Sequence, residues 1–259
     1  MKRNTLFSYV IIMLAYLLAS YVGKMRLDYL DWGNPYLEML MADIMATLVV
    51  FIFSLLFNNS SVYDPYWSVI PVPIALYWIS MHPEGLAVRQ WLIMGVILIW
   101  SLRLTINWMK SWSDLTHEDW RYRMLAEKSG KFYWLVSLTG IHLFPTLMVF
   151  LGMLPVLPAV SSPNPLGIFD ILGTIIALMA VFIEFVADEQ LRQFKRSNRQ
   201  KGLNMEAGIW ALTRHPNYLG EILFWMGLFF FAISAGPSAY YWTGIGFLAM
   251  LILFYFISI

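Results

Sequence analysis

The segment GIWALTRHPNYLGE, which ends at Glu221, combines groups that could bind an anionic ligand at the edge of a membrane. Pro216 suits the first turn of a helix, so Arg214 and His215 would lie at a helix N-terminus, where free N–H groups favour anions. Asn217 and Glu221 follow one turn apart on one helical face. A carboxylate that begins an apolar run is costly without a partner, so Glu221 is a candidate functional residue; a helix cap with a snorkelling charge is the alternative.

A second candidate group lies at the end of the apolar segment 167–187. Four charged residues are spaced by four, four and three positions, which places them on one helical face. They are Glu184, Asp188, Arg192 and Lys195. The two basic residues could simply anchor a helix to lipid headgroups. Two carboxylates one turn apart repel each other, however, and favour a cation or a hydroxyl-rich ligand. A face that is acidic inside and basic outside would suit the ribose and phosphates of an adenosine cofactor.

The apolar segment 88–109 carries Arg103, with Asn107 one turn later. A buried guanidinium needs a carboxylate or a phosphate as its partner. The sequence THEDWRYR follows and contains Arg121 and Tyr122. Its alternating acids, bases and aromatic residues fit either a solvated amphipathic loop or one wall of a nucleotide cleft.

Asp64 stands in the sequence VYDPYW, at the start of another apolar segment. The following proline restricts Asp64 to extended geometry, so it could be a helix cap and nothing more. Alternatively, Asp64 polarises a tyrosine hydroxyl, that of Tyr63, Tyr66 or Tyr218, which would then donate a proton to a substrate oxygen.

The composition indicates an all-α integral membrane protein. Hydrophobic residues make up 59% of the chain and charged residues 13%, against roughly 25% charged residues in soluble domains. The absence of cysteine excludes disulfides and thiolate metal sites. The four histidines lack metal-ligand spacing, so we expect no metal site. A net charge of +1 gives no reason to expect nucleic acid as a partner.

Eight apolar segments are long enough to cross, or nearly cross, a bilayer. They cover residues 5–22, 37–57, 66–81, 88–109, 132–155, 167–187, 218–234 and 238–259. Segment 66–81 is short and carries Pro71 and Pro73, which predicts a broken helix. No repeat or linker divides the chain, so we expect a single transmembrane domain over residues 1–259.

Basic residues concentrate in the segments 110–131 and 188–216, which two spans separate. Short loops rich in Lys and Arg face the cytoplasm. We therefore expect both segments on the cytoplasmic side, where they would form the loops that bind a cofactor.

Four segments resemble the membrane steroid 5α-reductase family, which includes bacterial members. They are WSLRL from Trp100, EDWRY ending at Tyr122, DEQLRQFK from Asp188 and TRHPNYLGE ending at Glu221, and the similarity runs from about residue 62 to the end of the chain. The pattern Arg-His-Pro-x-Tyr also occurs in isoprenylcysteine methyltransferase-like membrane enzymes, which bind S-adenosylmethionine.

The resemblance implies a seven-helix membrane core that binds NADPH on the cytoplasmic side, with a lipid-accessible cavity for a 3-oxo-Δ4 steroid. Segment 5–22 would be an additional N-terminal span. The resemblance also implies that Asp64 is the catalytic carboxylate. Glu184 replaces an asparagine of the family, Lys195 replaces an arginine, and the helix with Arg103 lacks the family's tyrosine. Cofactor contacts are implied for Asn217, Tyr218, Glu221, Asp188, Arg192, Lys195, Arg121 and Tyr122.

We therefore expect NADPH-dependent reduction of the C=C bond of an α,β-unsaturated 3-oxo steroid or steroid-like lipid, by a monomer in a bacterial inner membrane. Arg103, Arg192, Lys195 and Arg214 would hold phosphates, and Glu184 or Asp188 a ribose. A tyrosine paired with Asp64 would stabilise the enolate. Two alternatives stay open: an S-adenosylmethionine-dependent lipid or isoprenylcysteine methyltransferase, and a non-catalytic sterol-binding membrane protein.

Overall fold

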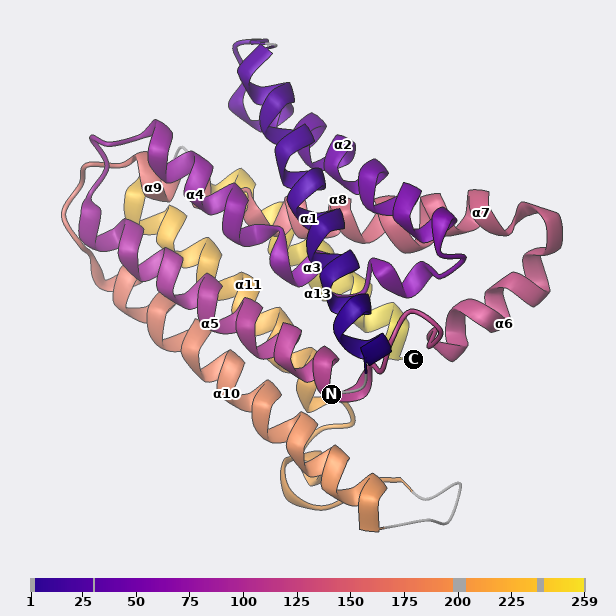
Figure 1. Ribbon diagram of the computed structural model, residues 1–259. Helices are drawn as coiled ribbons and strands as arrows, with labels where there is room; N and C mark the ends of the chain where they lie inside the picture. Colours follow the sequence, from indigo (N-terminus) through magenta and orange to yellow (C-terminus); the bar gives the residue numbers. More distant parts are fainter. Residues whose placement is uncertain (1–2, 30, 198–203, 237–239, 259) are drawn as a thin grey trace. The chain divides into compact units, whose positions relative to one another are not determined.

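A computed structural model describes residues 3–29, 31–197, 204–236 and 240–258. Within these ranges every regular element is helical (Figure 1). Six helical segments are long and apolar enough to cross a membrane, and a shorter apolar helical segment follows at Tyr241–Phe256. The expectation of an all-α, multi-pass integral membrane protein is confirmed. The kind of membrane and the orientation in it stay predictions.

Over their described residues, the eight predicted apolar segments lie largely on helices; residues 238, 239 and 259 of the last segment lie outside the described residues. The α-helices are α1 (Arg3–Tyr29), α2 (Pro35–Leu56), α3 (Tyr66–Val69), α4 (Pro71–Met81), α5 (Ala87–Ser111), α6 (Trp120–Ser129), α7 (Tyr133–Val136), α8 (Phe144–Met153), α9 (Val156–Ser161), α10 (Ile168–Ser197), α11 (Pro216–Ala235) and α13 (Ile245–Ser258).

Two predicted segments have a more complex structure than a single helix. Segment 66–81 is divided into α3 and α4 directly before Pro71, as the prolines predict. Segment 132–155 belongs to a helical run from Trp120 to Ser161 that contains a π-helical stretch, Ser137–Leu143. The predicted loop 188–216 is also partly helical, because α10 continues to Ser197; its residues 198–203 lie outside the described residues.

The chain forms two compact units. The first unit comprises residues 1–74 and 104–150, and the second comprises residues 75–103 and 151–259. The boundary crosses α5 between Arg103 and Leu104, so each unit contains part of this helix. The prediction of one transmembrane domain stays a prediction.

In the second unit, α10 and α11 pack through small residues. A Cβ atom on Gly173 would lie 2.7 Å from the carbonyl oxygen of Gly227, and one on Gly227 would lie 3.0 Å from the Cβ of Ala177. Small residues let two membrane helices approach closely enough for their backbones to touch. This close approach brings the polar residues at one end of α10 and α11 together.

Helices α5 and α10 are linked by two arginine–carboxylate pairs. Arg89 Nε donates to Asp170 Oδ1 at 2.7 Å, and both side chains are completely buried. Arg103, fourteen residues further along α5, pairs with Glu184, fourteen residues further along α10. The equal spacing shows that the two helices run parallel within the second unit, as Figure 1 illustrates.

Candidate functional site

Arg103 lies among three carboxylates in the second unit. Its Nη1 donates to Asp188 Oδ2 at 2.7 Å, its Nη2 pairs with Glu184, and Nη2 is 3.8 Å from Glu221 Oε1. Glu184 and Glu221 are both buried. The sequence prediction that separate spans bring these charges together is confirmed by this geometry. We call Arg103, Glu184, Asp188 and Glu221 the Arg103 cluster.

Aromatic rings cover one side of the Arg103 cluster. Trp100, one turn before Arg103 on α5, donates its indole N–H to Glu221 Oε2 at 3.3 Å. Its ring stacks on Phe224, with the centroids 4.6 Å apart. Because Trp100 is completely buried, it excludes water from this side of the carboxylates. Sequence reasoning did not single out Trp100 as a site residue; its spacing of one turn from Arg103 was the available signal.

The charge of the cluster changes the role expected for Arg103. One guanidinium faces three carboxylates, and an added phosphate would meet their negative charge at the same place. Arg103 therefore positions carboxylates and is poorly suited to bind phosphate, contrary to the role that we expected from the sequence. The carboxylate oxygens are instead suited to accept hydrogen bonds from a hydroxyl-rich or cationic ligand.

The N-terminus of α11 adds further groups. Pro216 occupies the first turn of the helix, as predicted. Asn217, one turn before Glu221, has a buried Oδ1 atom without a hydrogen-bond partner among the described residues. The Tyr218 ring stacks on His215, with centroids 4.9 Å apart, and its other neighbour is Phe254 of α13. Asn217 can therefore accept a hydrogen bond from a ligand.

The segment before α11 is held against α10. Gln190 Oε1 accepts from the backbone N–H of Ile209 at 3.1 Å, and the Trp210 indole donates to the carbonyl of Ala187 at 3.1 Å. Gly208 has a φ of +64° and lies so close to Gln190 that a larger residue would collide with it. These contacts hold the segment that leads to α11 against α10.

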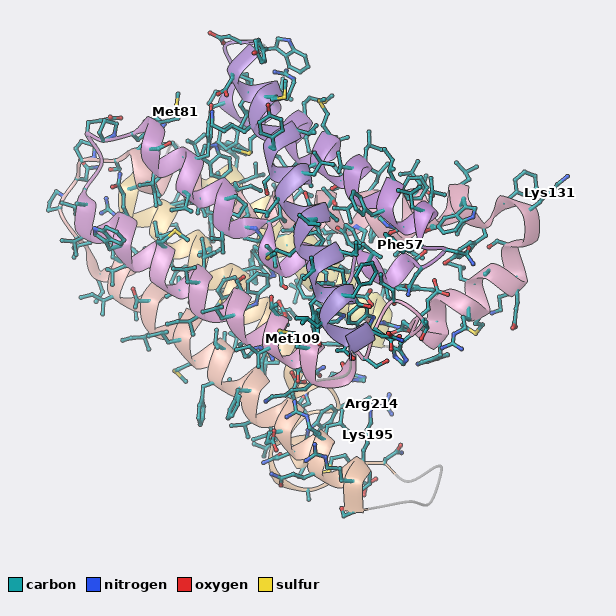
Figure 2. The ribbon with its side chains drawn as sticks, viewed as in Figure 1. Phe57, Met81, Met109, Lys131, Lys195 and Arg214 are labelled. Carbon is teal, nitrogen blue, oxygen red and sulfur yellow. The ribbon has the colours of Figure 1, made fainter. Side chains whose placement is uncertain are left out.

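Basic side chains continue outward from the cluster. Arg192 pairs with Glu189 on its own helix and is partly exposed, whereas Lys195 and Arg214 are exposed. Figure 2 shows Lys195 and Arg214 at the end of the second unit where α10 terminates. The order predicted for this face, acidic inside and basic outside, is confirmed.

Asp64 lies in the first unit and has a tyrosine partner. Tyr122 donates its hydroxyl hydrogen to Asp64 Oδ1 at 2.7 Å. Burial raises the pKa of Asp64 to about 7, although hydrogen bonds from Tyr122 and Ser61 lower it in part. Asp64 is therefore able to gain and lose a proton near neutral pH, which is a property of acid–base groups in enzymes.

The loop that contains Asp64 is attached to the loop that leads to Tyr122. Asn59 Nδ2 donates to the carbonyls of Leu115 and His117 at 2.7 and 3.0 Å. The backbone N–H of Asp119 donates to Ser61 Oγ at 2.9 Å. These bonds fix the relative position of Asp64 and Tyr122.

Tyr63 and Tyr66, which are two of the proposed partners of Asp64, have other partners. The Tyr63 hydroxyl lies 2.7 Å from Thr146 Oγ1, and the Tyr66 hydroxyl donates to Asp43 Oδ1 at 3.1 Å. Pairing of Asp64 with either residue was wrong. Tyr122, which we had expected to bind the cofactor, is its partner. Tyr122 lies 58 residues away in the chain, so helical spacing could not reveal the pair.

Two other predicted cofactor ligands belong to the first unit. Arg121 is exposed and pairs with Asp119, with Nη2 and Oδ2 2.9 Å apart. Asn107 lies one turn beyond Arg103 on α5, on the other side of the boundary between the units. Within the described ranges, no group of three or more His, Asp or Glu side chains has the arrangement of a metal site.

One protein-family model matches residues 50–259 of the chain. The chain belongs to the DUF1295 family. That family is described as a protein of unknown function. The DUF1295 match includes the Arg103 cluster, Asp64 and Tyr122, whereas α1 and the first part of α2, with Asp43, precede it.

An uncharacterized protein of Schizosaccharomyces pombe is also similar, with 24% identity over 249 aligned residues. The alignment covers 86% of this chain and 72% of the yeast protein. No solved structure matches the chain.

Proposed function

We propose that this protein reduces the C=C bond of an α,β-unsaturated ketone in a steroid or steroid-like lipid, with NADPH as the reductant. The observation that carries the proposal is the Arg103 cluster, in which α5, α10 and α11 each contribute a charged side chain. The resemblance of the same segments to the steroid 5α-reductase family supports it. A membrane protein also suits a substrate that partitions into lipid.

The groups around the cluster fit a dinucleotide. Asp188 and Glu221 would accept hydrogen bonds from ribose hydroxyls, and the partnerless Oδ1 of Asn217 would accept one more. The phosphates would lie further out, against Arg192, Lys195 and Arg214. When bound, NADPH supplies a hydride to the β carbon of the enone.

Asp64 and Tyr122 would act on the substrate carbonyl. As hydride reaches the β carbon, negative charge develops on the carbonyl oxygen, and a proton taken up from water at the α carbon would then complete the saturated ketone. A Tyr122 hydroxyl that donates to the carbonyl oxygen would stabilise the enolate. Asp64 can be protonated near neutral pH, and its hold on the Tyr122 hydroxyl is then weaker, so the hydroxyl can turn toward the substrate.

The test is NADPH oxidation by the purified protein with 4-cholesten-3-one and other 3-oxo-Δ4 steroids, with identification of the saturated product. Tyr122→Phe should lower kcat at least about a hundredfold while it leaves NADPH binding intact. Asp188→Asn should instead weaken NADPH binding. Oxidation that is independent of both residues, or no oxidation although NADPH and the steroid bind, would refute the proposal.

The charge of the cluster favours one alternative function. S-adenosylmethionine carries a sulfonium and an ammonium group together with a ribose, and three carboxylates around one arginine suit such a cation better than they suit a phosphate. A lipid methyltransferase is therefore the second candidate. Thermal stabilisation by S-adenosylmethionine but not by NADPH would select it. Stabilisation by sterols alone would select the non-catalytic sterol-binding protein.

A further inference from the structure

The first unit contains a buried carboxyl group that the proposed reaction does not use. Asp43 lies within α2 and is 2% exposed, and Tyr66, its partner, is 1% exposed. Tyr66 donates to Oδ1 of Asp43 at 3.1 Å. The other oxygen, Oδ2, is buried and has no hydrogen-bond partner in the described part of the chain.

The neighbouring hydroxyl groups are already occupied with one another. Thr47, one turn after Asp43 on α2, has its Oγ1 2.8 Å from Thr146 Oγ1. Thr146 in turn is 2.7 Å from the Tyr63 hydroxyl. The Tyr66 ring is held between Tyr16 of α1 and Tyr63, with centroids 5.4 and 5.5 Å away. Tyr66 is thus fixed in place, whereas Oδ2 of Asp43 is left without a hydrogen-bond partner among the described residues.

The surroundings of Asp43 determine what that partner is. Asp43 forms no ion pair among the described residues, and α2 is a membrane-spanning helix. An ionised carboxylate in such a place, with one neutral hydroxyl as its partner, is far more costly than a neutral acid. A neutral acid that accepts from Tyr66 at Oδ1 carries its hydrogen on Oδ2. A buried donor of this kind favours a hydrogen-bond acceptor.

We propose that Asp43, as a neutral acid supported by Tyr66, donates a hydrogen bond to the carbonyl oxygen of a bound lipid. An apolar site that combines a neutral carboxylic acid with a tyrosine is well suited to a carbonyl oxygen, because both groups can place positive hydrogen charge near it. The site is separate from the Asp64–Tyr122 pair, and binding there does not require NADPH. The acceptor is a sterol ketone or the ester carbonyl of a membrane lipid.

Substitution of Asp43 by asparagine or by leucine tests whether this residue acts as a hydrogen-bond donor. Asp43→Asn keeps an oxygen for Tyr66 and an N–H donor in place of the acid hydrogen, so it should bind as the wild type does. Asp43→Leu has the same branched shape, with methyl groups in place of the oxygens and no donor, so its affinity should fall about tenfold. Asp28→Asn, at the exposed pair with Lys24, is the control.

The experiment measures binding of 4-cholesten-3-one and cholesterol without NADPH, in nanodiscs of ester-linked or ether-linked phospholipid. If 4-cholesten-3-one binds more tightly than cholesterol, and this preference is lost in Asp43→Leu and kept in Asp43→Asn, the acceptor is a sterol ketone. Lower thermal stability in ether lipid, found for the wild type and absent in Asp43→Leu, supports a lipid ester. Preference for cholesterol with loss in Asp43→Asn, or no effect of either variant, would overturn the proposal.

A spectroscopic measurement decides the matter if Asp43→Leu does not fold. The infrared spectrum of the wild type at neutral pH should contain a carboxylic acid C=O band that is missing in Asp43→Asn. Absence of that band would overturn the proposal. Neither measurement uses NADPH, so a negative result here would not contradict the proposed reductase activity. Likewise, absence of reductase activity would not contradict the proposed lipid site at Asp43.

Discussion

The hydroxyl of Tyr122 lies 2.7 Å from Oδ1 of Asp64, and these two residues hold together loops that are 58 residues apart in the chain. Burial raises the pKa of Asp64 to about 7 in the folded protein, against roughly 3.9 in an unfolded chain. Between pH values of about 4 and 7, Asp64 is therefore protonated in the folded state and ionised in the unfolded state. The contribution of Asp64 protonation to folding stability is full below about pH 4 and is lost as the pH rises through about 7.

Asp64→Asn should remove this dependence. Thermal unfolding in detergent, followed between about pH 5 and pH 8, should show a flatter profile than the wild type, with the largest gain in stability at the alkaline end. Asp119→Asn is the contrasting variant. Burial of Asp119 opposes ionisation, but hydrogen bonds from Arg121 lower its pKa, so its contribution is present at neutral pH and lost in acid. Equal profiles for both variants would contradict the assignment.

Gly220→Ala should separate α10 from α11 at the Arg103 cluster. A Cβ atom at this position would collide with the Glu184 side chain and lie 2.9 Å from the backbone carbonyl of Ala180, which cannot move without α10. We expect a loss of about 1–3 kcal/mol in stability and weaker ligand binding. Gly95→Ala on α5 meets nothing within 4 Å and serves as the control. Equal stability of the two variants would exclude a close contact at Gly220.

The buried pair of Arg89 and Asp170 gives a prediction about coupling. Arg89→Leu alone leaves a buried carboxylate without its cation and should cost about 3–5 kcal/mol, and Asp170→Leu should cost a similar amount. The double variant should cost much less than the two single variants together. SDS-induced unfolding measures the three values. Lys24→Ala, at an exposed pair, should cost about 1 kcal/mol or less. Additive losses at Arg89 and Asp170 would show that the pair is not coupled.

If the outer basic residues bind phosphates, salt should weaken NADPH binding. Arg192→Ala and Lys195→Ala should each reduce affinity about tenfold at low ionic strength and make binding less sensitive to salt. Asp188→Asn should reduce affinity without changing the salt dependence, because it is expected to contact a ribose. Isothermal titration over a series of NaCl concentrations distinguishes the two patterns. A salt dependence that none of these substitutions alters would place the phosphates elsewhere.

The Arg103 cluster could be predicted because its evidence is local. Glu184 and Asp188 are four residues apart on one apolar helix, and the cost of burying charge in a membrane requires that opposite charges on different spans meet. The same reasoning identified Arg103 and Glu221 without any knowledge of how the helices pack. The sequence could not show that three carboxylates surround the one guanidinium of Arg103. This arrangement is the reason why Arg103 is less suited to bind phosphate than we expected.

The partners of the tyrosines could not be predicted, because they depend on tertiary structure. Tyr63 and Tyr66 are near Asp64 in sequence, yet the turn between Asn59 and Pro65 directs their hydroxyls to Thr146 and Asp43. Segment 37–57 has Glu38 at its start and Asp43 further inside the apolar run, and this inner position was a signal for Asp43. The π-helical stretch at Ser137–Leu143 was not predicted, because an extra residue in a helical turn depends on packing and has no fixed sequence pattern.

The two arginine–carboxylate pairs between α5 and α10 have the same separation on both helices, about 21 Å at 1.5 Å per residue. If α5 slid along α10 by one turn, Arg89 would leave Asp170, and a buried guanidinium and a buried carboxylate would each lose its partner. Axial sliding is therefore blocked. An opening that admits a ligand to the Arg103 cluster is therefore expected from a motion that leaves the pair of Arg89 and Asp170 in place.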